Sequence, residues 1–231
     1  MDTAMIRHRR DGSVLALIHL FGLSYFTLFL PYFFIYHFPQ SVHFIVSTQA
    51  IAFHSVGVML WCSFGVFYQT LTAIRPGQAS SWQRLEWGAA FVLMYTTAVP
   101  FILVRFSEYP PLQIFYISAF TAVGVRSGVE VFNMKEGSES NERFLDSISF
   151  GLVTLAPAIH LFSQYPHDLS LLDTGLIQHV LISAMGVVCG VIQLPERLGM
   201  VGSWSPSLYT MHLTLVLSGI CYSKCLLDAT G

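Results

Sequence analysis

Six ionisable or polar side chains fall in or beside apolar stretches, where such groups are costly and usually face a bundle interior to pair or to mark a reaction path. They are Tyr68, Glu86, Arg126, Glu130, Asp146 and His212. A carboxylic acid kept neutral by burial can protonate an epoxide or an alkene, and a neighbouring imidazole can orient it or accept a proton. The residue types therefore favour acid–base chemistry on an apolar compound.

Glu86 is the leading candidate for the acid, with His212 and Tyr68 as orienting or proton-accepting partners. Asp146 begins an apolar segment at a similar depth and is an alternative acid. Arg126 and Glu130 are four residues apart, so they share one helix face. We expect this pair either to support the acid or to form a structural ion pair at the headgroup boundary.

The elements that must position these residues are transmembrane helices. Apolar residues make up 54% of the chain and charged residues only 10%, and the mean hydropathy is +0.60, which does not describe a soluble domain. No Asp, Glu, Lys or Arg occurs from Gly12 to Ile74, a run long enough for two crossings of about 20 residues each. We expect an all-α integral membrane protein, with one seven-helix domain over residues 1–231. The predicted spans are roughly 14–37, 46–71, 86–104, 112–132, 145–163, 175–194 and 205–223.

The distribution of cations predicts the orientation. The end of the predicted bundle opposite the N-terminus has only Arg105 and Lys224 near helix ends. The positive-inside rule therefore places the N-terminus in the cytosol and the C-terminus in the lumen or outside. We expect the membrane to be that of the endoplasmic reticulum or another endomembrane. The net charge of −2 argues against a nucleic-acid partner. The cations on the N-terminal side are Arg7, Arg9, Arg10, Arg75, Arg84, Lys135, Arg143 and Arg197.

Four short motifs, in order along the chain, resemble a known family. Pro195-Glu196-Arg197 leads into Ser207-Leu208-Tyr209-Thr210-Met211-His212, which resembles the PER and S-H-x-x-x-H signature of the adiponectin and progestin receptor (PAQR) and haemolysin III family. That resemblance implies a seven-helix membrane fold. The remaining motifs are Ile18-His19-Leu20-Phe21-Gly22, Leu85-Glu86-Trp87-Gly88 before Pro100, and Pro157-Ala158-Ile159-His160.

The resemblance also implies a zinc site, and this chain departs from it. The family binds zinc through a histidine ending span two, two histidines beginning span seven, and an aspartate near the start of span three. The corresponding residues here are Tyr68, Leu208, His212 and Glu86. Because one imidazole and one carboxylate cannot close a tetrahedral zinc site, we expect neither a metal nor another cofactor.

The other histidines have structural expectations. His54 lies roughly 20 Å along its helix from Tyr68, so we expect a packed polar residue there. His19 and His160 are expected to form hydrogen bonds between helices. The remaining four, His37, His43, His167 and His179, are expected at an interface or in the lumen.

Aromatic residues suggest a cavity for a long apolar substrate. Ring faces could stabilise a carbocation inside the bundle. Divergent fungal relatives of the resembled family include terpene cyclases, so the resemblance implies an acid-catalysed, metal-independent cyclase of an isoprenoid or meroterpenoid. The residues expected to line the interior are Phe64, Phe67, Tyr68, Trp87, Tyr95 and Tyr209.

Two other functions stay open. One is the usual role in the resembled family, a lipid receptor or a zinc-dependent, ceramidase-like hydrolase. The other is a proton or ion pathway, which the dry stretches Ala89–Met94 and Leu213–Leu217 disfavour. The expected partners are an apolar isoprenoid or lipid substrate and the membrane lipids, whereas the sequence leaves the oligomeric state open.

Overall fold

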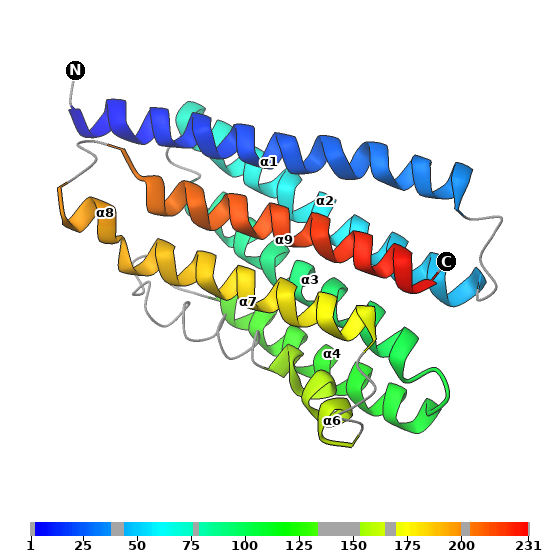
Figure 1. Cartoon of the computed structure of the whole chain (residues 1–231). Coiled ribbons are helices and arrows are strands. Elements are labelled where there is room, and N and C mark those ends of the chain that lie inside the picture. The colour runs from blue at the N-terminus through cyan, green and yellow to red at the C-terminus, as the bar shows by residue number, and fades with distance from the viewer. Residues whose placement is uncertain are drawn as a thin grey trace.

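The described residues of this computed structural model are 3–37, 44–75, 79–133, 153–164, 170–199 and 204–230, and they form a bundle of helices (Figure 1). The helices are α1 (Thr3–Tyr36), α2 (Phe44–Ile74), α3 (Ala79–Arg105), α4 (Pro110–Asn133), α6 (Ala156–Gln164), α7 (Leu171–Ile192), α8 (Leu194–Arg197) and α9 (Pro206–Thr230). The predicted all-α class is confirmed for this part of the chain.

Six helices are long and apolar enough to cross a membrane, which indicates a multi-pass membrane protein. Each overlaps one predicted span. Of the remaining predicted span, 145–163, residues 145–152 lie outside the described residues, so the count of seven and the cytosolic N-terminus stay predictions. The candidate spans are Asp11–Tyr36, Thr48–Thr72, Ser80–Arg105, Pro110–Asn133, Leu171–Arg197 and Pro206–Ala229.

Helices α1 to α4 alternate in direction, as do α7 and α9, and the two chain ends lie at opposite ends of the bundle (Figure 1). We call the end with the start of α1 and α9 the N-side, and the other end the C-side. Helix α9 packs mainly on α7 and also contacts α1 and α2, while α2 packs on α1 and α3. These contacts bring α1, α2, α3 and α9 together, although their sequences are far apart.

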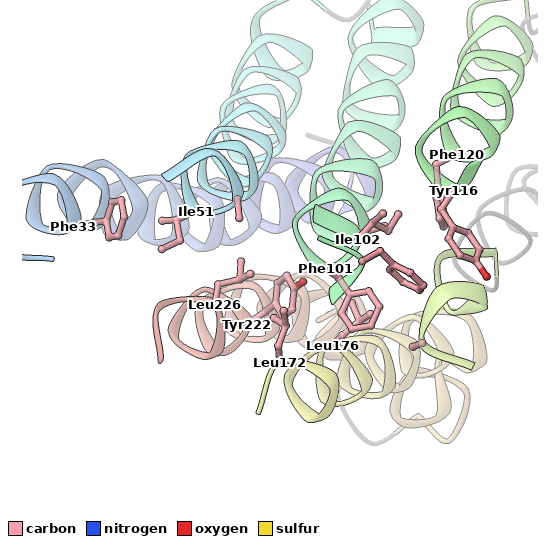
Figure 2. Packing of buried hydrophobic residues seen from close by; sticks show 14 residues of the cluster. Phe33, Ile51, Phe101, Ile102, Tyr116, Phe120, Leu172, Leu176, Tyr222 and Leu226 are labelled. Atoms are coloured by element: carbon pink, nitrogen blue, oxygen red, sulfur yellow. The ribbon is translucent and has the colours of Figure 1, made fainter. Parts of the chain in front are cut away.

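The C-side half of the bundle holds the larger apolar core. Phe33, Phe101, Leu176 and Tyr222 are among its buried members, contributed by four helices (Figure 2). Lipid is as apolar as this core, so close van der Waals packing rather than hydrophobic burial stabilises such helix contacts. The core thereby fixes the helices that extend to the N-side.

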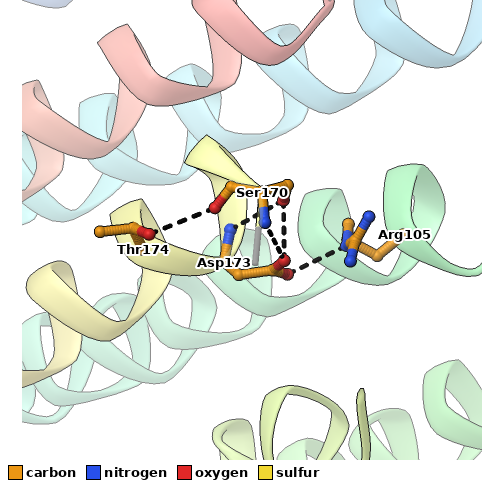
Figure 3. A network of polar contacts seen from close by, with 4 residues as sticks. All are labelled: Arg105, Ser170, Asp173 and Thr174. Atoms are coloured by element: carbon orange, nitrogen blue, oxygen red, sulfur yellow. Dashed lines mark hydrogen bonds and ion pairs between the residues drawn. The ribbon is translucent and has the colours of Figure 1, made fainter. Parts of the chain in front are cut away.

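The start of α7 is fixed to the end of α3 by a polar network (Figure 3). The Ser170 hydroxyl accepts a hydrogen bond from the Asp173 backbone N–H at 3.2 Å, and the Ser170 backbone N–H donates to the Asp173 carboxylate at 2.7 Å. This reciprocal arrangement is a capping box. Arg105 then donates from Nε to Asp173 at 3.0 Å, which neutralises the buried carboxylate.

The start of α9 is capped by the glutamate of the Pro195-Glu196-Arg197 motif. Glu196 accepts one hydrogen bond from the Ser207 backbone N–H at 2.8 Å and another from the Ser207 hydroxyl at 2.6 Å. A carboxylate at a helix N-terminus satisfies a free N–H group and suits the helix dipole. The two halves of the sequence signature therefore contact each other, and the contact fixes the part of α9 that carries His212.

Candidate functional site

Three ionisable side chains from three helices meet in the N-side part of the bundle. They are His19 of α1, Glu86 of α3 and His212 of α9, and one donor atom from each lies within 4.8 Å of the others. His19 Nε2 and His212 Nδ1 are 3.0 Å apart and share a hydrogen bond, while His19 Nε2 lies 3.9 Å from Glu86 Oε1. We call this group the His19–Glu86–His212 centre.

The centre lies below the N-side ends of its helices. At about 1.5 Å per residue, His19 is about 12 Å along α1 from Asp11, and His212 is about 9 Å along α9 from Pro206. His19 is fully buried and His212 nearly so, whereas the Glu86 side chain retains 13% exposure. Glu86 is thus the most exposed residue of the centre, although its Oε1 atom is buried.

Helix α2 supplies the wall of the centre. The indole of Trp61 lies parallel to the His212 ring, with centroids 6.1 Å apart, and is edge-to-face with the His19 ring, with centroids 4.7 Å apart. One turn further, Gly65 gives the His19 ring its space, because a Cβ atom at this position would lie 2.4–2.6 Å from three imidazole atoms. Trp61 and Gly65 therefore restrict the position of the His19 ring.

Two buried polar atoms of the centre lack a hydrogen-bond partner among the described residues, namely Glu86 Oε1 and His19 Nδ1. A buried polar group without a partner costs roughly 1–3 kcal/mol, and such atoms call for a functional or solvent explanation. Glu86 Oε1 is the more informative of the two, because it faces two imidazoles. Its position suits a group that exchanges a proton or binds a cation.

A second carboxylate fixes the register of α1 against α9. Asp11 accepts a hydrogen bond from the Ser205 hydroxyl at 2.8 Å and another from the Tyr209 hydroxyl. Asp11 is two turns before His19, and Tyr209 is nearly one turn before His212. The contact therefore holds the two helices in the register in which their histidines meet. Sequence reasoning missed Asp11, because nothing local distinguishes it from an ordinary residue at a span boundary.

Of the predicted site residues, Glu86 and His212 are brought together, and Tyr68 lies nearby along α2. Tyr68 is half-buried and three residues beyond Gly65, so it lies on the same face of α2, toward the N-side. Asp146 lies outside the described residues.

Arg126 and Glu130 do not join the buried centre. Arg126 Nε donates to Glu130 at 2.9 Å within α4, and the two side chains are 80% and 41% exposed. This geometry fits the alternative expectation of a structural ion pair, and the supporting role beside Glu86 is not favoured. Their spacing predicts a common helix face but not the direction in which that face points.

The structure confirms the expectations for His54 and His160 and corrects the one for His179. His54 is fully buried and donates to the Gly219 carbonyl at 3.2 Å, as expected for a packed polar residue. His160 is hydrogen-bonded to the Tyr116 hydroxyl of α4, and His19 also bonds between helices, as predicted. The expectation for His179 was wrong, because this residue is buried against Tyr222, with ring centroids 5.5 Å apart.

The expected aromatic lining is also revised. Phe67 is 49% exposed and contacts Trp82, while the Tyr95 hydroxyl is hydrogen-bonded to Thr121 of α4 at 2.9 Å. Trp87 packs in a small cluster with Phe91 and Val131 rather than on the two histidines. Trp61, which the sequence did not single out, is the ring that contacts the centre.

An apolar layer lies next to the centre and disfavours a continuous ion pathway. On α1, α2, α3 and α9, respectively, the buried residues Phe26, Val58, Leu93 and Val216 pack into one cluster. On α9, Val216 follows His212 by one turn and precedes Gly219, the partner of His54. The two histidine regions are thus separated by dry side chains.

The donor set of the centre fits a transition-metal ion. The expectation of no metal rested on one surviving nitrogen at the family positions, but the structure adds His19 as a second nitrogen. Two imidazoles and one carboxylate are the ligand types of catalytic zinc sites that keep an open position. Comparison with models of known families finds no match, and comparison with curated proteins finds none either.

Proposed function

We propose that the protein is a membrane-embedded terpene cyclase of an endomembrane, which acts on an isoprenoid or meroterpenoid dissolved in the bilayer. The observation that carries this proposal is the buried Glu86 Oε1, which lacks a hydrogen-bond partner among the described residues and lies 3.9 Å from His19 Nε2. A general acid needs such a free oxygen to reach its substrate. The resemblance of the sequence motifs to the PAQR and haemolysin III family, with its cyclase relatives, supports the same choice.

The mechanism assigns one role to each member of the centre. Glu86 donates its proton to an epoxide oxygen or an alkene carbon, which generates a carbocation on the substrate. An internal alkene attacks this carbocation, a ring bond forms, and the final cation loses a proton to the His19–His212 pair, which returns it to Glu86. The Trp61 ring, which contacts both histidines, can stabilise the cation through its face. The product is an isomer of the substrate.

A zinc-dependent lipid hydrolase is the second candidate, because His19, Glu86 and His212 fit a metal ion. When bound there, zinc would activate water for attack on an amide. The two functions need Glu86 in different states, since a proton donor holds a hydrogen at the oxygen that a metal would occupy. Metal dependence therefore separates them.

The experiment that tests the proposal uses purified protein in detergent after treatment with a chelator. With an epoxy-isoprenoid, we expect a cyclic product of unchanged mass, because acid catalysis by Glu86 needs no metal. The same preparation supplied with zinc and a ceramide-type amide is the control for the second candidate. Amide hydrolysis that requires zinc, with no isomerisation in either preparation, would contradict the cyclase and restore the hydrolase.

A further inference from the structure

The cyclase mechanism leaves one property of the centre unused, namely that its three donor atoms converge. Only 3.0 Å separates His19 Nε2 from His212 Nδ1, and all donors lie within 4.8 Å of one another. Ligands at about 2.0–2.2 Å from a tetrahedral zinc ion are about 3.3–3.5 Å apart. The observed separations are 3.0 Å for the two imidazoles, 3.9 Å for His19 and Glu86, and at most 4.8 Å for the third pair, so the side chains would have to shift to surround one ion.

The chemistry of the donors selects the class of ion. Imidazole suits zinc, copper, nickel and iron, whereas calcium and magnesium prefer shells made of oxygen. The centre offers two imidazole nitrogens, and its carboxylate oxygen Glu86 Oε1 has no hydrogen bond to lose among the described residues. A zinc-class divalent ion therefore fits better than a hard cation.

We propose that the His19–Glu86–His212 centre binds one divalent transition-metal ion and that this ion inhibits the cyclase. The ion would bind His19 Nε2, His212 Nδ1 and Glu86 Oε1 in place of the proton between the two imidazoles and the proton of Glu86, so the oxygen that carries the catalytic proton would no longer be free. The binding part rests on the donor geometry alone, while the inhibitory part rests on the proposed function. Metal availability would then regulate the enzyme, because the metal ion and the catalytic proton compete for Glu86 Oε1.

The binding part is tested without any turnover measurement. Full-length protein in detergent is dialysed against Zn²⁺ or Co²⁺ and analysed for bound metal, with the visible absorption of Co²⁺ as a second readout. We expect one ion per chain, bound with at least about 10-fold lower affinity in Glu86→Gln and in His212→Gln, since even changes outside the ligand shell cost that much. His54→Gln is the matched control, because His54 is equally buried but lies outside the centre.

X-ray absorption of the zinc-loaded wild type keeps the proposal falsifiable if a variant fails to fold. Two imidazoles with oxygen ligands are expected, whereas a sulfur ligand or the absence of imidazole would overturn the proposal. Equal binding by wild type and Glu86→Gln would also overturn it.

For inhibition, turnover should fall in proportion to bound zinc and recover with a chelator. Bound zinc that leaves turnover unchanged overturns the inhibitory part alone, and a wild type that binds as expected but never cyclises refutes only the proposed function.

Discussion

Glu86→Gln is expected to lower cyclisation by at least about 100-fold while the fold changes little, since loss of a general acid has this scale. Glutamine keeps the size of the side chain but has no transferable proton. Glu86 Oε1 makes no hydrogen bond among the described residues, so the substitution removes no hydrogen bond at that atom. The measurement is the turnover rate per folded protein, with folding checked by thermal unfolding in detergent.

Variants of two other carboxylates, Glu130 and Asp146, test this assignment. Glu130→Gln should keep nearly full turnover, because Glu130 is partly exposed and pairs with Arg126 within α4. If Glu86→Gln retains activity while Glu130→Gln or Asp146→Asn abolishes it, the acid is misassigned although the cyclase stands. If none of the three variants affects turnover, acid catalysis by these carboxylates is wrong.

Gly65→Ala is expected to have the second-largest effect. Its Cβ would lie 2.4–2.6 Å from atoms of the His19 ring, which is fully buried, so the ring must move. Overpacking of this kind costs about 1–3 kcal/mol of stability, and a displacement of about 1 Å in a catalytic centre can cost about 100-fold in rate. We therefore expect a lower unfolding temperature together with a large loss of turnover.

Gly128→Ala is the matched control, because a Cβ at Gly128 meets no atom within 4 Å among the described residues. It should leave turnover unchanged. A double variant shows whether the effect passes through His19. Adding Gly65→Ala to His19→Ala should cost little more than His19→Ala alone, because the ring that clashes is gone. Full turnover in Gly65→Ala would show that the position of His19 does not matter.

Six of the spans were predictable because hydropathy and length set them, and six helices long and apolar enough to cross a membrane overlap the predicted ranges. The depth of His212 followed from the same pattern, whereas Glu86 was expected as the first residue of its span and lies six residues inside Ser80. The neighbour of His212 did not, because His19 is 193 residues away in sequence and meets it only through packing of α1 on α9. The same holds for Trp61 and Gly65, whose importance depends on which face of α2 meets α1.

The residues whose burial was wrongly expected from the sequence share one physical cause. A membrane helix is apolar toward lipid and toward its neighbours, so the pattern does not show which face points inward. Phe67 was therefore expected to line the interior but is 49% exposed, and His179 was expected at an interface but is buried. For the same reason the sequence left two positions open for Arg126, which is 80% exposed. Sequence reasoning gave position along each helix but not rotation about its axis.

The central claim is that Glu86 carries the catalytic proton, and the infrared difference spectrum between metal-free wild type and Glu86→Gln at neutral pH tests it most directly. The carbonyl band of a protonated carboxylic acid and the bands of a carboxylate are separate, so the spectrum reports the state of this one side chain. We predict that the wild type shows a carboxylic-acid carbonyl band that Glu86→Gln lacks. If the variant instead loses only carboxylate bands, Glu86 is ionised before reaction and cannot be the general acid.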